Sequence, residues 1–97
     1  MNRKINLALQ VIPSSESKHP YEIVDAAIQY IRSTGIKYEV CPFETVMEGE
    51  YDVIMDIVKQ VQLVCFEAGA SDLIVNIKIQ NRAGSDVTIE EKMNKYR

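Results

Sequence analysis

Residues 35–50 read GIKYEVCPFETVMEGE and contain two extended runs that are separated by a proline. Apolar and polar side chains alternate over residues 36–41, and a second β-prone run covers residues 43–48. Pro42 interrupts the alternation, because proline has no backbone N–H to donate to a neighbouring strand. The stretch predicts two antiparallel strands with a tight connection, and Gly49 is expected to end the second strand.

Amphipathic helices are predicted on both sides of this strand pair. Before it, apolar residues recur every three or four positions over about residues 21–33, and Gly35 suits a left-handed C-terminal cap. After it, Glu50 and Asp52 fall in the first turn of a second helix, where carboxylates oppose the positive end of the helix dipole. The apolar stripe of that helix continues until Gly69, which is expected to end it.

Two further strands and a short terminal helix complete the predicted elements. Residues 5–12 place aliphatic side chains at every second position, as a strand with one buried face does. The same alternation returns over residues 73–80. Thr88 and Glu91 form a capping-box signature, which predicts a short helix over residues 89–96.

The order of these elements is strand, helix, strand, strand, helix, strand. In 97 residues this order fits one α+β domain, residues 1–97, with a ferredoxin-like four-stranded antiparallel sheet and two helices on one face. We expect the first and fourth strands to be central and their second faces to lack an intrachain cover. Because a half-apolar open face favours pairing with another copy, the sequence predicts a homo-oligomer. The residues on those faces are Ala8, Gln10, Ile12, Ile74, Asn76, Lys78 and Gln80.

Composition narrows the possible partners and location. The net charge of −3 and the pI near 5.1 argue against nucleic acid. The longest apolar stretch covers residues 63–66, far less than the roughly 20 residues that cross a bilayer, so no membrane span is expected. Cys41 and Cys65 lack CxxC spacing and nearby histidine, which predicts reduced thiols, no metal site and a cytoplasmic protein.

The densest group of functional side chains is Glu44, Thr45, Glu48 and Glu50. Alternation places Glu44 and Glu48 on one face of the strand and Thr45 on the other. No nucleophile with an adjacent base is recognisable, so we expect binding and not catalysis. A purely structural alternative is that Glu48 caps the turn and Glu50 complements the helix dipole.

Several segments of the chain resemble the small thiamine-binding protein family. They are the strand ending Val11-Ile12-Pro13, residues 35–40, the group Thr45-Val46-Met47-Glu48-Gly49-Glu50 and the terminal segment 88–97. The resemblance covers essentially the whole chain, and the Thr-x-x-Glu-Gly-Glu group is its most specific part. It implies a ferredoxin-like domain that dimerises through its sheets and commonly forms a tetramer. It also implies binding of thiamine or its hydroxymethylpyrimidine moiety, with no cofactor and no catalysis.

The resemblance supports Thr45 and Glu48 most directly as ligand contacts, whereas Glu44 occupies a position at which relatives vary. An aminopyrimidine needs a carboxylate or amide for its nitrogens and an aromatic or apolar slot for its faces. Further residues that could supply these groups are Tyr38, Phe43 and Asn76. The family's strand-to-helix loop has a second glycine, and here Ser14 and Ser15 stand in its place.

Two other function classes remain open at this point. A regulatory or scaffolding oligomer would use the open sheet face without a small-molecule ligand. An enzyme acting on a thiamine fragment ranks last, because neither a nucleophile nor a metal site is recognisable.

Lys78 on the open face needs a partner, and Glu39 or Glu48 of another subunit is the expected one.

Overall fold

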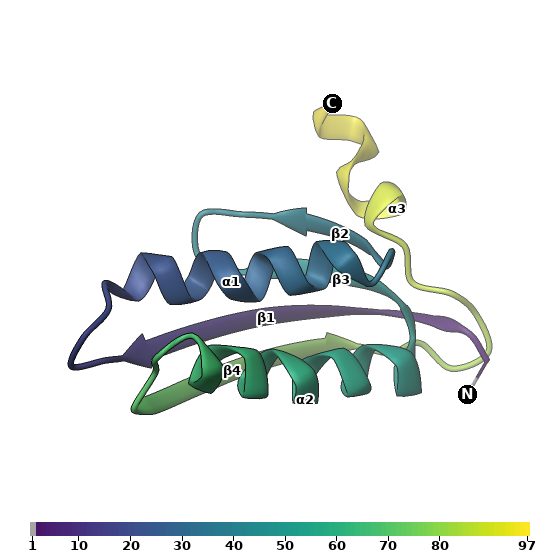
Figure 1. Cartoon of the computed structure of the whole chain (residues 1–97). Coiled ribbons are helices and arrows are strands. Elements are labelled where there is room, and N and C mark those ends of the chain that lie inside the picture. The colour runs from purple at the N-terminus through teal and green to yellow at the C-terminus, as the bar shows by residue number, and fades with distance from the viewer. Residues whose placement is uncertain (1) are drawn as a thin grey trace.

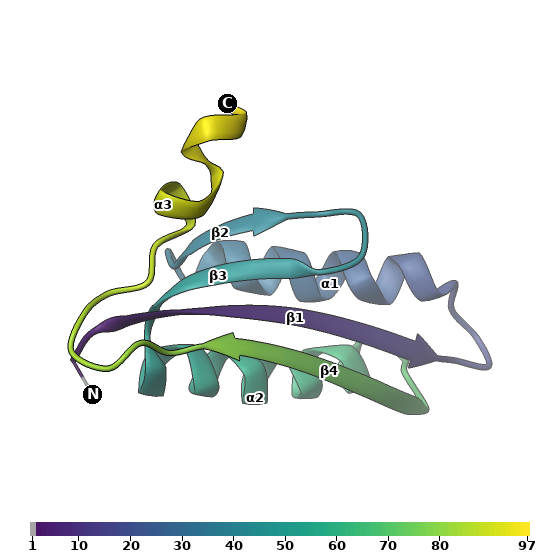
Figure 2. The ribbon, with the colours of Figure 1, turned by 180° about the vertical axis from the view of Figure 1, so that it is seen from behind.

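The computed structural model describes residues 2–97 and has the predicted ferredoxin-like α+β architecture (Figure 1). A single antiparallel sheet has the strand order β2-β3-β1-β4, and α1 and α2 cover one of its faces. Figure 2 shows the other face, which neither of these helices covers. The elements are β1 (Lys4–Ser14), α1 (Pro20–Ser33), β2 (Lys37–Val40), β3 (Thr45–Glu50), α2 (Tyr51–Glu67), β4 (Asp72–Gln80), α3 (Ile89–Met93) and the 3-10 helix η1 (Asn94–Tyr96).

The hydrophobic core lies between the sheet and the two long helices. Alternate residues of β1 point toward the helices and are buried, and the helices return residues spaced by three or four positions. The buried cluster consists of Ile5, Leu7, Leu9, Ile23, Ala27, Ile31, Met47, Ile54, Ile57, Val58, Val61 and Cys65. In the part of the chain that the structure describes, no helix is long and apolar enough to cross a membrane.

The predicted position of the fourth strand was wrong. β1 and β3 are the central strands, while β4 lies at an edge and pairs only with β1 among the described strands. The helical crossover from β1 to β2 leaves a gap between these two strands, and β3 fills it. The free side of β1 is then the position left for β4.

The expectation that Gly49 ends β3 was also wrong. The strand continues through Gly49 to Glu50, and Glu50 is the N-cap position of α2. A Cβ atom on Gly49 would lie 2.6 Å from Cδ1 of Ile36. Glycine at position 49 therefore lets β3 pass close to the Ile36 side chain. The strand ends at Glu50, one residue later than the position of Gly49 suggested.

Polar contacts fix the start of α1 and the loop before it. His19 is its N-cap, and the Nδ1 atom accepts a hydrogen bond from Tyr21 N–H at 3.1 Å. In the preceding loop, the Ser15 hydroxyl donates to the carbonyl oxygen of Gly69 at 2.7 Å. Ser15 thus ties this loop to the end of α2.

The C-terminal segment, residues 86–97, crosses onto the open side of the sheet. Thr88 and Glu91 make the predicted capping box, and Val87 is fully buried. The predicted helix is divided into α3 and η1, which rise beyond β2 at the edge of the molecule (Figure 2). The Arg97 guanidinium pairs with Glu39 of β2, so the tail is held at both of its ends.

Candidate functional site

The sheet separates the residues that were predicted to bind one ligand together. Thr45 and Met47 point from β3 toward the helices, and Thr45 is only 6% exposed. Glu48 is 5% exposed and points to the open face, where it meets the C-terminal segment. The alternation of β3 causes this separation, because residues three positions apart lie on opposite faces. One protomer therefore does not present Thr45 and Glu48 to the same side of a ligand.

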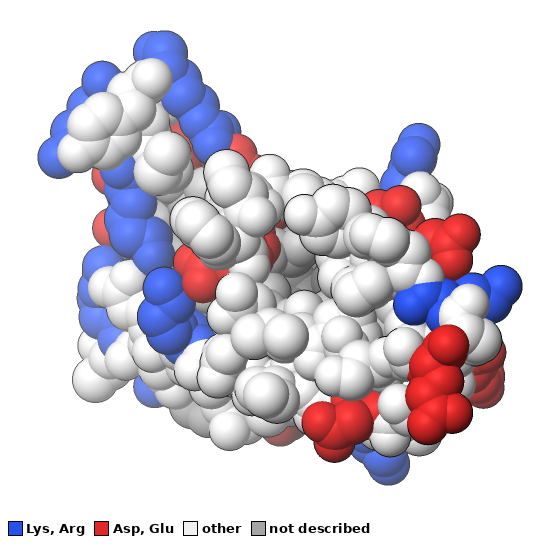
Figure 3. Space-filling view, turned by 90° about the vertical axis from the view of Figure 1, so that its left-hand side faces the viewer, with Lys and Arg blue, Asp and Glu red and all other residues white. Residues whose placement is uncertain are grey.

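Three of the six predicted residues line one cavity, which we call the recess. It has a volume of about 80 Å³ and lies between α1, β1 and the connection from β2 to β3. Figure 3 views this end of the molecule and shows a hollow whose rim is mostly uncharged. Its lining includes Val24, Ile28, Cys41, Phe43, Glu44 and Thr45.

The recess combines apolar walls with the Thr45 hydroxyl, and Glu44 contributes to its lining. No group in residues 2–97 hydrogen-bonds the Thr45 hydroxyl, so this group is available to a ligand. The Glu44 side chain is 28% exposed. The backbone carbonyl of Glu44 accepts a hydrogen bond from Cys41 N–H at 2.9 Å, which closes the turn. Phe43, which is 82% exposed, lies on the same turn. This arrangement suits a flat ring that carries a hydrogen-bond donor.

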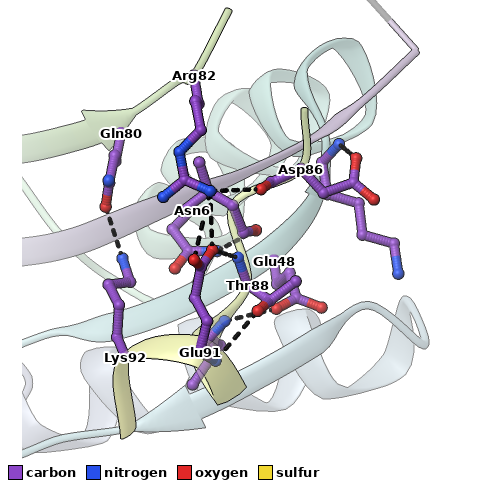
Figure 4. A network of polar contacts seen from close by, with 11 residues as sticks. Asn6, Glu48, Gln80, Arg82, Asp86, Thr88, Glu91 and Lys92 are labelled. Carbon is purple, nitrogen blue, oxygen red and sulfur yellow. Dashed lines mark hydrogen bonds and ion pairs between the residues drawn. The ribbon is translucent and has the colours of Figure 1, made fainter. Parts of the chain in front are cut away.

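Glu48 is engaged within the chain. Glu48 lies close to the start of α3 (Figure 4), and its Oε1 atom accepts a hydrogen bond from Ile89 N–H at 2.7 Å. Its Oε2 atom lies 3.9 Å from Lys37 Nζ. The carboxylate thus satisfies a free N–H at the start of α3, where the helix dipole also favours a negative charge. The structural alternative for Glu48 was a cap on its own turn, whereas the group that it caps lies 41 residues further along the chain.

The other predicted residues lie outside the recess. Tyr38 is partly buried and packs against the core from β2. Asn76 lies on the open face, where its amide donates to Gln10 Oε1 at 3.2 Å. Lys78 Nζ lies 3.2 Å from Glu44 Oε2, so its partner within this chain differs from the expected Glu39 or Glu48 of another subunit.

Comparison with known proteins identifies the family. The model of the family described as thiamine-binding protein matches residues 7–97. The chain belongs to the thiamine-binding protein family. This agrees with the resemblance seen in residues 35–50 and in the terminal segment.

Three relatives of this thiamine-binding family member match over more than nine-tenths of their lengths. A UPF0045 protein of Clostridium perfringens is 49% identical over 92 residues, which are 95% of this chain and 96% of that protein. A domain of unknown function from Bacillus cereus has a TM-score of 0.94 at 42% identity, covering 98% of this chain and 91% of that one. A Thermotoga maritima structure, of a protein proposed to act in thiamine biosynthesis or salvage, has a TM-score of 0.88 at 39% identity. The match covers 97% of this chain and 99% of that one.

Sequence reasoning missed Asn6, which helps to hold the C-terminal segment of this family member. Asn6 is 4% exposed, and its amide donates to the carbonyl oxygen of Val87 at 3.0 Å (Figure 4). Val87 N–H in turn donates to the Lys4 carbonyl oxygen at 2.9 Å. A buried amide between apolar neighbours in a strand was the available signal, because such a group requires a hydrogen-bond partner.

A second set of polar contacts stabilises the start of α3. The Glu91 carboxylate accepts from Thr88 N–H at 2.8 Å and from the Arg82 guanidinium at 3.2 Å. These bonds, first that from the Thr88 backbone and then that from Arg82, lower the pKa of Glu91 below its usual range. The C-terminal segment is therefore held by charge as well as by the buried side chain of Val87.

Proposed function

We propose that this protein binds thiamine or its hydroxymethylpyrimidine moiety in the recess and leaves the ligand chemically unchanged. The observation that carries the proposal is the unbonded Thr45 hydroxyl, which lies among apolar walls in a recess that Glu44 also lines, in a member of the thiamine-binding family. A cytosolic location is part of the proposal, and it is supported by the free thiols of Cys41 and Cys65.

The chemistry of the recess fits an aminopyrimidine. An exocyclic amino group donates to a carboxylate such as Glu44, and a ring nitrogen accepts from a hydroxyl such as Thr45. The carboxylate also offsets the positive charge of a thiazolium ring. Because about 80 Å³ corresponds to roughly two or three water molecules, the recess holds one edge of the pyrimidine. The remainder of the ligand would lie against Phe43, whose ring is exposed beside the opening.

Contacts from Glu48, Asn76 and Tyr38 stay predictions. Glu48 and Asn76 lie on the open face, so they reach a ligand held there or one that extends around the edge of the sheet. Tyr38 shares the helix-facing side of the sheet with Thr45 and supports the strand that frames the recess. Thr45 and Glu44 are therefore the residues on which the proposal depends most.

Self-association through the open face is the second part of the proposal. Ile12 and Ile74 are paired across β1 and β4, and they remain 44% and 54% exposed. Two adjacent aliphatic side chains on an uncovered sheet favour contact with a second copy of the chain. This pair also favours the alternative function, a regulatory or scaffolding oligomer without a ligand.

A calorimetric titration separates the two functions. We expect saturable heat when thiamine or hydroxymethylpyrimidine is added to the oligomer, and less binding by Thr45→Val. A scaffold without a ligand gives no heat with either compound while its oligomeric state persists. Recovery of the added compound unchanged after incubation tests the absence of catalysis.

A further inference from the structure

The open face carries a second concavity, which we call the basic hollow. It has a volume of about 290 Å³ and is lined by Asn6, Glu44, Val46, Lys78, Gln80 and Lys92, among others. In the register of β1 and β4, Asn6 pairs with Gln80, whereas Ile12 pairs with Ile74 further along the strands. Gln80 lies six positions after Ile74, which is about 20 Å of strand. The basic hollow and the apolar pair thus occupy opposite ends of the same face.

Hydrogen-bond donors outnumber acceptors in the basic hollow. Lys92 Nζ donates to Gln80 Oε1 at 2.9 Å (Figure 4), which occupies the oxygen of that amide and leaves its NH₂ group to donate elsewhere. Each lysine carries three N–H donors. Lys78 uses one donor on Glu44 and Lys92 uses one on Gln80, so both ammonium groups keep donors for a further partner.

The charge of the basic hollow is opposite to that of the whole protein. Lys78 and Lys92 contribute two positive charges and Glu44 one negative charge, in a chain whose net charge is −3. Among the described residues, no carboxylate lies within ion-pair distance of Lys92. An anion in the hollow would supply the missing partner, and its several oxygens would match donors that come from β4 and α3.

We propose that the basic hollow binds a small tetrahedral oxyanion, of the class formed by inorganic phosphate and phosphate monoesters. The inference goes beyond the proposed function, because the recess that we assign to the pyrimidine is a different cavity, which shares only Glu44 with the lining of the basic hollow. Lys92 and Lys78 supply charge-assisted hydrogen bonds, and Gln80 supplies an amide donor between them. Since both lysine side chains are exposed, each bond is screened by water and salt, and the affinity is expected to be modest.

The test follows backbone amide signals by NMR while sodium phosphate is added at constant ionic strength, with chloride as the reference anion. We expect saturable shifts at residues 78–80 and at Lys92. A second titration uses thiamine monophosphate, which distinguishes a phosphate ester from the free ion as the source of the group. Thiamine itself serves as the third ligand, because it carries no phosphate.

Matched variants assign the site. Lys92→Gln should weaken phosphate binding by about two- to fivefold, and Lys78→Gln with Lys92→Gln should abolish the saturable shifts. Lys59→Gln is the control, since Lys59 is exposed on α2, on the other side of the sheet. Equal loss in the control and the double variant, or no saturable shift in the wild type, would overturn the proposal. Thiamine binding at the recess would survive that result, so failure of the hollow and failure of the proposed function are distinguishable.

Discussion

The Oε1 atom of Glu48 accepts a hydrogen bond from Ile89 N–H at 2.7 Å, and this bond joins β3 on the open face to the C-terminal segment. The glutamate is almost completely buried, and Lys37 provides the nearest positive charge. A buried carboxylate is tolerated only where such partners replace the water that it loses. The most conspicuous acidic residue of the predicted binding motif therefore has a structural role that the sequence motif does not reveal.

Replacing this carboxylate should loosen the C-terminal segment. Glu48→Gln keeps an acceptor for Ile89 N–H but removes its charge, so we expect the free energy of unfolding to fall by about 1 kcal/mol. Amide hydrogen exchange in α3 should accelerate, whereas Glu90→Gln, an exposed change on the same helix, should leave it unaltered. The ligand role predicted for Glu48 requires in addition a roughly ten- to hundredfold loss of thiamine affinity. Unchanged thiamine affinity in a folded Glu48→Gln protein would limit this residue to its structural role.

The Thr45 hydroxyl should matter for the ligand and not for the fold. Thr45→Val removes a group without a partner in the described chain, so the melting temperature should be maintained. Thiamine affinity should fall by about two- to tenfold, because one neutral hydrogen bond is lost. Thr34→Val provides the opposite pattern, since the Thr34 hydroxyl donates to Ile31 and accepts from Ile36. It should lower the melting temperature and leave thiamine affinity intact.

The strand and helix pattern was predictable because each element buries one face, and side-chain periodicity records that face. The strand order was not, because alternation in residues 73–80 is the same for a central and an edge strand. The opposite orientations of Thr45 and Glu48 did follow from alternation. The bond from Glu48 to Ile89 could not be anticipated, because the partners are far apart in sequence and depend on the path of residues 81–88.

Ligand in the recess should protect Cys41 from alkylation. Cys41 is partly exposed and lines the recess, whereas Cys65 is completely buried and burial raises the pKa of its thiol. In a Cys65→Ala background, thiamine should slow the reaction of iodoacetamide with Cys41 in a saturable manner. In the folded wild type, Cys65 should react only after denaturant is added. An unchanged Cys41 rate at saturating thiamine would place the ligand elsewhere.

A charge at the apolar end of the open face should dissociate the oligomer. Ile74→Glu would bury an unpaired carboxylate at the proposed contact, as would Ile12→Glu on the neighbouring strand. Leu63→Glu makes the same chemical change on α2, where Leu63 is 48% exposed, and should leave assembly unaffected. Sedimentation velocity at micromolar concentration measures the result. A wild-type species of only 11.0 kDa would contradict self-association, and intact assemblies in both open-face variants would show that another surface is used.

Acid should release the C-terminal segment through Glu91. Its pKa is lowered in the folded protein by the bonds from Thr88 and Arg82, so the ionised form is the one that the fold stabilises. This contribution is complete above about pH 4.3, the ordinary pKa of glutamate, and is lost as the pH falls through the lower folded value. Hydrogen exchange in α3, corrected for its intrinsic pH dependence, should therefore show local opening that increases below about pH 4.

Glu91→Gln should remove this acid-dependent step and leave α3 more open at neutral pH, because glutamine cannot ionise and pairs less strongly with Arg82. An acid profile identical in wild type and Glu91→Gln would show that Glu91 does not control the opening of this segment.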